Sequence, residues 1–121
     1  MKTLNKKIGF YGESLASDYL ISKNHKIIKK NFFSKHCEID LISLDKEILV
    51  FTEVKSRMYF KFGTPLESIN FNKIKNIKKT ALYYIHKNNE YNRYIRFDVI
   101  EIFLSPTNSD YKINHLEDAF R

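Results

Sequence analysis

Cysteine is nearly absent from this sequence, since the 121 residues contain only Cys37. One cysteine cannot form a disulfide within the chain, and it cannot supply the thiolate cluster of a structural zinc site. The sequence therefore excludes a fold that depends on internal disulfides. Scarce cysteine is typical of a reducing compartment, and we expect a cytoplasmic protein.

Glycine and proline are also scarce, with three and two residues. We find no linker, low-complexity tract, internal repeat or Gly-rich phosphate loop, and the histidines lack zinc-ligand spacing. No apolar stretch approaches the roughly 20 residues that cross a bilayer, and no apolar run follows the basic N-terminus. Nucleotide hydrolysis, zinc chemistry, secretion and membrane insertion are therefore not predicted.

Basic residues outnumber acidic ones by 21 to 14, which gives a formal net charge of +7. Such a charge attracts phosphate-bearing partners. The same composition would also result if the lysines only kept the surface hydrated. Hydrophobic residues make up 43% of the chain, enough to bury one core. We expect one domain over residues 1–121.

Hydrophobic periodicity and turn residues predict the order αβββαβ followed by a tail, which is an α/β arrangement. Thr64-Pro65-Leu66-Glu67 has the form of a capping box with proline at the first helical position. The predicted elements are a helix over 7–24, antiparallel strands over 26–33, 37–44 and 47–56, a loop over 57–63, a helix from 64 or from 72 to 87, an interior strand over 94–104, and a shorter strand or extension from 111.

Acidic residues occur on two neighbouring predicted strands. Because side chains alternate across a strand, Glu38 and Asp40 share one face of the first, and Glu53 and Lys55 share one face of the second. Two carboxylates at the edge of a core repel each other unless a divalent cation neutralises them. Mg²⁺ or Mn²⁺ suits such oxygen ligands. Asp40 and Glu53 are then candidate ligands, and Lys55 a candidate to orient water or stabilise charge.

The register of the hairpin decides whether these groups meet. A two-residue turn at Asp45-Lys46 places Asp40 opposite Phe51, with Glu53 diagonal to it on the same face. A three-residue turn would put Asp40 on the opposite face. A simple pairing of Asp40 with a surface lysine is an alternative that needs no metal.

Glu13 is a further acidic candidate, at the edge of the apolar stripe of the first helix. Gly9 and Gly12 beside it would permit close approach of the helix to the sheet. An acid near a helix N-terminus also complements the helix dipole without any metal, and the residues alone favour that interpretation.

Four ordered segments carry a family resemblance: Gly12-Glu13, Cys37-Glu38-Ile39-Asp40-Leu41-Ile42, Val50-Phe51-Thr52-Glu53-Val54-Lys55-Ser56-Arg57 and Arg96-Phe97-Asp98-Val99-Ile100. Over nearly its whole length the chain resembles the YraN-like family of bacterial proteins. That family is similar to the restriction-endonuclease-like superfamily and, in motif order, to archaeal Holliday-junction resolvases. Cys37 departs from the family pattern, which usually has glycine there.

The resemblance implies a mixed sheet flanked by helices and a metal-dependent endonuclease that hydrolyses phosphodiester bonds in DNA, including branched recombination or repair intermediates. It implies Asp40 and Glu53 as metal ligands, a backbone carbonyl ligand from Val54, and an acid–x–Lys pair completed by Lys55. It also makes Glu13 the helix-borne acid of the site, which reverses the preference from the residues alone.

Several basic residues are candidates for phosphate contacts: Arg57, Lys61, Lys73, Lys75, Lys78 and Lys79. The main alternative to a nuclease is a nucleic-acid-binding or adaptor module without turnover. A third reading is an interaction protein that binds neither metal nor nucleic acid. Junction cleavage would further require a two-fold homodimer, which the sequence does not show.

Overall fold

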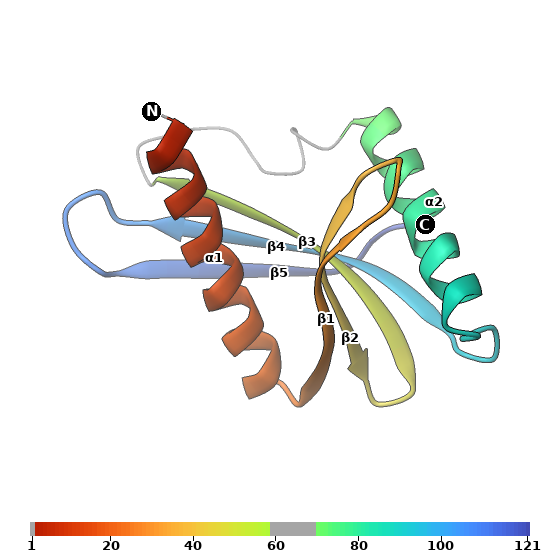
Figure 1. Cartoon of the computed structure of the whole chain (residues 1–121). Helices are drawn as coiled ribbons and strands as arrows, with labels where there is room; N and C mark the ends of the chain where they lie inside the picture. The colour runs from red at the N-terminus through yellow and green to blue at the C-terminus, as the bar shows by residue number, and fades with distance from the viewer. Residues whose placement is uncertain (1, 59–69) are drawn as a thin grey trace.

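The computed structural model describes residues 2–58 and 70–121 (Figure 1). The elements are, in chain order, α1 (Lys2–Ser22), β1 (His25–Phe33), β2 (Glu38–Asp45), β3 (Ile48–Met58), α2 (Phe71–Lys87), β4 (Ile95–Leu104) and β5 (Tyr111–Phe120). The predicted capping box at 64–67 and the predicted phosphate contact Lys61 lie outside the described residues.

The strands form one mixed sheet in the order β1-β2-β3-β4-β5. Strand β3 pairs with β4 in parallel, and every other neighbouring pair is antiparallel. A parallel pair needs a long crossover, and α2 lies within it. The predicted α/β class, with a mixed sheet flanked by helices, is confirmed, and it is compatible with a restriction-endonuclease-like fold.

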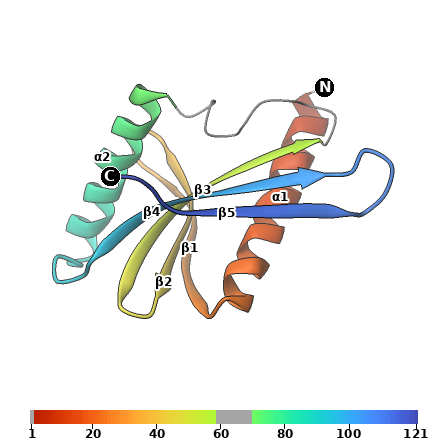
Figure 2. The same cartoon turned by 180° about the vertical axis from the view of Figure 1, so that it is seen from behind.

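The helices cover opposite faces of the sheet (Figures 1 and 2). On one face, Ala16 and Leu20 of α1 pack with buried side chains of β2 and β4. On the other face, Ile77 and Ala81 of α2 pack with a second cluster, which includes Phe51 of β3. Apolar side chains at helical spacing give each helix one buried stripe, so the sheet has a core on both sides.

The C-terminal tail forms a longer strand than the sequence predicts. Strand β5 contains ten residues, and it pairs with β4 from Leu104–Tyr111 to Phe97–Phe120. Helix α2 begins at Phe71, where the side chain of Asn70 accepts a hydrogen bond of 2.9 Å from the Lys73 N–H. This N-cap confirms the predicted start near residue 72. None of the described helices is both long and apolar enough to cross a membrane.

The predicted turn between β2 and β3 is wrong by one residue. The turn residues are Lys46 and Glu47, and Asp45 pairs with Ile48. Lys46 has a φ of 56°, the left-handed conformation that two-residue hairpin turns use at a central position. Since moving a two-residue turn by one position preserves the alternation, the side chains from Leu41 to Asp45 keep their predicted faces. The residue opposite Phe51 is Ile42, however, and Asp40 lies beyond the last pair of the ladder.

The sheet splits between β2 and β3. Their pairing ends at Leu41–Thr52, whereas β3 continues beside β4 as far as Met58–Leu104. Figure 1 shows the β1–β2 ribbon turning away from β3, β4 and β5 toward α2. Asn31 of β1 has a φ of 53° at the level of this split. Among the described residues, no strand pairs with this edge of the second half of β3, which is therefore an open edge, and the candidate site lies there.

Candidate metal centre

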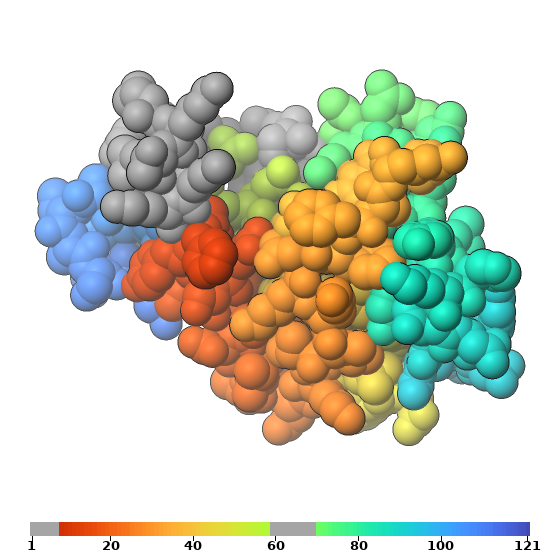
Figure 3. All heavy atoms as spheres, viewed as in Figure 1, coloured from red at the N-terminus to blue at the C-terminus, as the bar shows by residue number. Residues whose placement is uncertain are grey.

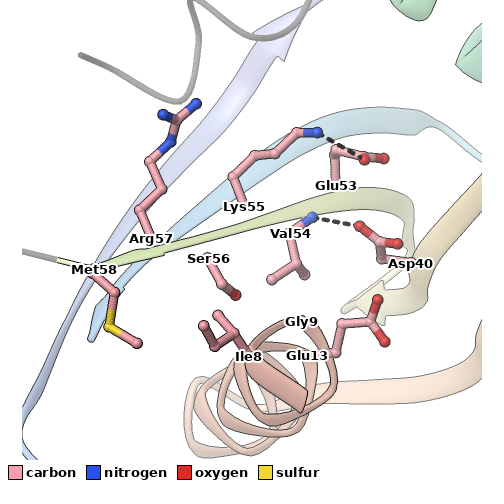
Figure 4. A pocket seen from close by; sticks show the side chains of 10 residues that line it. All are labelled: Ile8, Gly9, Glu13, Asp40, Glu53, Val54, Lys55, Ser56, Arg57 and Met58. Carbon is pink, nitrogen blue, oxygen red and sulfur yellow. Dashed lines mark hydrogen bonds and ion pairs between the residues drawn. The ribbon is translucent and has the colours of Figure 1, made fainter. Parts of the chain in front are cut away.

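A cavity of about 460 Å³ lies between α1 and the second half of β3 (Figure 4). Figure 3 shows the yellow-green atoms near the end of β3 in the gap between α1, in red, and β1, in orange. The described residues that line the cavity are Ile8, Gly9, Glu13, Asp40, Glu53, Val54, Lys55, Ser56, Arg57 and Met58. The structure thus brings together the four predicted catalytic residues and Val54.

Asp40 lies at the split itself. Its Oδ2 accepts a hydrogen bond of 2.7 Å from the Val54 N–H, so a side-chain carboxylate bonds to β3 just beyond the last pair of the β2–β3 ladder. The pKa of Asp40 is raised to about 8, chiefly by burial and then by the negative charge of Glu53, although the Val54 hydrogen bond opposes both. Ionised Asp40 is costly here unless a positive charge arrives.

Glu53 is the most buried acid of the cavity, with 6% of its surface exposed. Its Oε1 lies 3.7 Å from the Nζ of Lys55 and 3.7 Å from the Nζ of Lys73 on α2. Its Oε2 is buried and has no hydrogen-bond partner among the described residues. Burial raises the pKa of Glu53, and the two lysines oppose the shift. A buried carboxylate oxygen without a partner is suited to a cation ligand.

A second group of carboxylates converges at the same split. Glu13, Glu38 and Asp40 each offer an oxygen atom within 4.8 Å of the others. Oxygen atoms at such separations can share one hard cation after small side-chain rotations, because each would lie about 2.0–2.6 Å from the ion. Glu53 lies outside this group, although its charge and that of Glu38 raise the pKa of Asp40.

Two further residues of the site, Glu38 and Asn31, were not predicted from the sequence. The side-chain amide of Asn31 donates to Glu13 Oε2 at 3.1 Å and also to Glu38 Oε1, so it bridges the two carboxylates. Glu38 had a signal, since it is two positions before Asp40 on one strand. Asn31 had none, because its place depends on the split of the sheet.

The side chains do not share one regular strand face as predicted. Figure 4 shows Glu53 and Lys55 on one side of β3, and Val54 and Ser56 on the side of α1. Glu53 and Lys55 share a face as expected. The side chain of Asp40 instead crosses the open edge of β3 and accepts the hydrogen bond from the Val54 N–H, because the β2–β3 ladder ends before Asp40.

Close approach of α1 to β3 depends on one of the two glycines. A Cβ atom on Gly12 would overlap Ser56 Oγ and would lie 2.8 Å from Ser56 Cβ. Gly12 thus lets the helix bring Glu13 to the cavity, as predicted. The same prediction for Gly9 is wrong, because a Cβ atom there would meet no atom within 4 Å among the described residues.

The predicted phosphate-binding residues have different surroundings. Lys73 is paired with Glu53, and Lys78 donates to the backbone carbonyl of Arg121. Arg57 lines the cavity. Lys75 and Lys79 are exposed on α2.

Asp98 and its partners form a second polar cluster, between β4 and β5 and away from the cavity. Asp98 is fully buried and accepts hydrogen bonds from Arg96 Nε at 2.8 Å and from the Asp118 N–H at 3.0 Å, and His115 Nε2 lies 2.8 Å from its Oδ2. Burial acts to raise the pKa of Asp98, but the hydrogen bonds from His115 and Arg96 hold it below its usual value. These residues hold the last two strands together.

The fold and the site define an α/β protein whose mixed sheet splits to present carboxylates and a lysine at one cavity. The chain belongs to the uncharacterised protein family UPF0102, whose profile matches residues 12–102. The match confirms the family resemblance that the sequence motifs indicated.

The relatives are similar over their full lengths. A UPF0102 protein of Clostridium botulinum strain Alaska E43 is 50% identical over 121 residues, which cover 100% of this chain and 99% of the relative. That of Clostridium perfringens strain 13 is 48% identical over 121 residues, with the same coverage. That of Clostridium novyi strain NT is 46% identical over 120 residues, which cover 99% of this chain and 100% of the relative.

Proposed function

We propose that this chain is a metal-dependent endonuclease that hydrolyses phosphodiester bonds in DNA, including branched recombination and repair intermediates. The observation that carries the proposal is Glu53, a buried acid whose Oε2 has no hydrogen-bond partner within residues 2–58 and 70–121, at a cavity that also contains Asp40 and Glu13. A lysine beside a pair of carboxylates can serve metal-assisted phosphodiester hydrolysis, because the carboxylates hold the ion and the lysine stabilises negative charge.

The residues present fit a hard cation. Glu13, Asp40 and Glu53, together with the backbone carbonyl of Val54, offer only oxygen atoms, which favour Mg²⁺ or Mn²⁺ over softer metals. A bound ion would lower the pKa of a water molecule and neutralise charge on a phosphate. Its positive charge would also offset the burial and the repulsion from Glu53 that raise the pKa of Asp40.

The protein's own groups have separate tasks. The Val54 N–H orients the carboxylate of Asp40. Lys73 holds Glu53 from α2, which leaves Lys55 Nζ, partly exposed at the cavity, to stabilise negative charge on a phosphate oxygen. We therefore assign Lys55 the catalytic cation and Lys73 a positioning role.

The partner follows from charge and from the family resemblance. The net charge of +7 favours a polyanion. The candidate contacts are Arg57, which lines the cavity, and Lys75 and Lys79, which are exposed on α2. The family resemblance alone suggests two further parts of the proposal. These are a branched substrate and a two-fold dimer that presents two sites. With one cysteine, the protein would work in the reducing cytoplasm.

The test is a cleavage assay with increasing Mg²⁺ or Mn²⁺ on linear duplex, single-stranded and four-way-junction DNA. We expect metal-dependent cutting that Asp40→Ala and Lys55→Ala abolish and that Lys26→Ala, a change of an exposed lysine at the start of β1, retains. Light scattering would show whether the active species is a dimer. Salt-sensitive binding without cutting or metal uptake would overturn the proposal and leave a nucleic-acid-binding module.

A further inference from the structure

A second surface of interest lies where the end of β1 meets α2, outside the carboxylate cavity. Two shallow hollows of about 430 and 340 Å³ adjoin there, and Phe33 lines both. We call it the β1–α2 surface and define it by six side chains that line the hollows: Lys29, Phe33, Lys35, Lys79, Tyr83 and Lys87. All six are exposed, and Figure 3 shows β1, in orange, beside α2, in teal, on one face of the molecule.

The aromatic side chains of this surface are not needed for the core. Phe33 is 66% exposed and Tyr83 is 46% exposed, although the neighbouring residues Phe32 and Tyr84 are buried. The rings of Phe32 and Tyr83 lie 5.9 Å apart with an interplanar angle of 30°, so the buried ring supports the exposed one. Phe33 and Tyr83 line the same hollow, and two exposed rings in one hollow are suited to stacking against a flat ligand.

The charge around the rings is of one sign. The four lysines of the surface belong to three segments: β1, the turn after it, and α2. The Nζ of Lys87 lies 6.0 Å from the centre of the Tyr83 ring. None of the described residues that line the two hollows is acidic. The surface thus combines aromatic faces with a positive potential, which favours a ligand that has both rings and phosphates.

The surface is connected to the candidate site through β1. Asn31 lines the first hollow, and its amide donates to Glu13 and Glu38 of the carboxylate cluster. Phe33 is two residues further along β1, about 7 Å away at the usual rise of a strand. A strand of nucleic acid that lies on the surface would therefore extend toward the split of the sheet.

We propose that the β1–α2 surface binds unpaired nucleotides, with bases stacked on Phe33 and Tyr83 and phosphates held by the lysines. This inference rests on the proposed nuclease function and narrows its substrate to nucleic acid with a single-stranded segment beside the cut. A continuous duplex offers phosphates to the lysines, but its bases are already stacked on one another and cannot cover the two rings.

The test measures binding in EDTA on an Asp40→Ala background, so that neither metal nor cutting contributes. Fluorescence anisotropy would compare labelled strands of 12 deoxynucleotides, the same sequence in RNA, a blunt duplex, and an abasic strand with the same number of phosphates. We expect tighter binding of a base-bearing single strand than of the duplex or the abasic strand. The DNA and RNA strands identify which nucleic acid is preferred.

The variants Phe33→Ala and Tyr83→Ala should each weaken binding of the base-bearing strand by about tenfold and leave binding of the abasic strand unchanged. Tyr111→Ala is the matched control, since Tyr111 is also 46% exposed but begins β5 at the opposite end of the sheet from α2 (Figure 1). Circular dichroism would verify that each variant is folded. If Tyr83→Ala does not fold, Phe33→Ala decides the question, because Phe33 is more exposed.

Equal affinity for abasic and base-bearing strands would overturn the inference, as would an equal loss in Tyr111→Ala. These outcomes would leave a nuclease with a purely electrostatic substrate site. Conversely, a metal-independent preference for unpaired bases, lost in Phe33→Ala, would stand even if no cutting were found. The failure of one proposal is therefore distinguishable from the failure of the other.

Discussion

Asp40 combines a structural hydrogen bond with an environment that opposes its charge. Its pKa is about 8, raised by burial and then by Glu53. The unfolded chain would ionise Asp40 near pH 4, so between about pH 4 and pH 8 the folded state binds more protons than the unfolded state. The contribution of Asp40 to the free energy of unfolding of the metal-free protein must therefore decrease as the pH rises from about 4 to about 8.

Replacing Asp40 by asparagine should stabilise the metal-free fold at pH 8. Asparagine keeps an oxygen that accepts from the Val54 N–H but carries no charge. We expect Tm to rise by about 4 °C at pH 8, the effect of roughly 1 kcal/mol in a chain of this size, and to change little at pH 4. Calorimetry in EDTA measures this, with the exposed acid of Asp18→Asn as control. A lower Tm at both pH values would contradict the argument.

Glu38 should contribute to metal affinity although the sequence did not place it in the site. Its carboxylate lies in the cluster with Glu13 and Asp40. We expect Glu38→Gln to weaken Mn²⁺ binding by about tenfold in isothermal titration calorimetry, because one oxygen donor loses its charge. Glu47→Gln, in the exposed β2–β3 turn, is the matched control. Unchanged affinity in Glu38→Gln would remove Glu38 from the site.

Packing of α1 on β3 positions Glu13. Alanine substitutions at Gly12 and Gly9 of α1 test whether this packing is as close as the structure shows. Gly12→Ala would collide with Ser56 and push α1 away, at a cost of about 1–3 kcal/mol. Gly9→Ala meets open space and should stabilise the helix by up to about 1 kcal/mol. Urea unfolding measures both values.

A rescue experiment distinguishes this collision from a general loss of helix stability. Ser56→Gly removes the atoms that a Cβ atom on Gly12 would meet, so it should restore much of the stability and metal affinity lost in Gly12→Ala. Equal effects of alanine at positions 9 and 12, without rescue, would show that helix packing does not control the site.

The pairing of β4 with β5 depends on the buried carboxylate of Asp98 as well as on apolar contacts, because His115 and the Asp118 N–H of β5 both bond to it. Asp98→Ala would leave Arg96 and His115 without their common partner, and we expect a loss of about 3 kcal/mol in urea unfolding. Because the pKa of Asp98 is depressed, its contribution is present above pH 4 and is lost as the pH falls through the folded value. Asp110→Ala, an exposed acid before β5, should change stability little.

At the scale of the whole molecule, the charge of +7 predicts strongly salt-dependent binding of nucleic acid. If the four lysines of the β1–α2 surface each contact one phosphate of a single strand, log K should fall with log salt at a slope of about −2.8. Raising NaCl fourfold, from 50 to 200 mM, would then weaken binding by about 50-fold in an anisotropy titration. A slope near zero would exclude phosphate contacts as the source of affinity.

The residues that the sequence identified are those whose placement depends on local geometry. Alternation along β3 put Glu53 and Lys55 on one face, and helical spacing put Glu13 at the edge of a buried stripe. The register of the β2–β3 turn was predicted one residue early, because Asp45-Lys46 and Lys46-Glu47 are equally polar and only the backbone conformation of Lys46 distinguishes them.

The sequence by itself determined the order of the elements, the α/β class and the acid–x–Lys pair, because hydrophobic periodicity and strand alternation act over a few neighbouring residues. Only the tertiary structure decided that β2 and β3 separate beyond Leu41–Thr52, that Asp40 turns to the Val54 N–H, and that Asn31 bridges Glu13 and Glu38. These contacts join residues 14 or more positions apart in most cases, and they form only where two strands stop pairing, which no local pattern encodes.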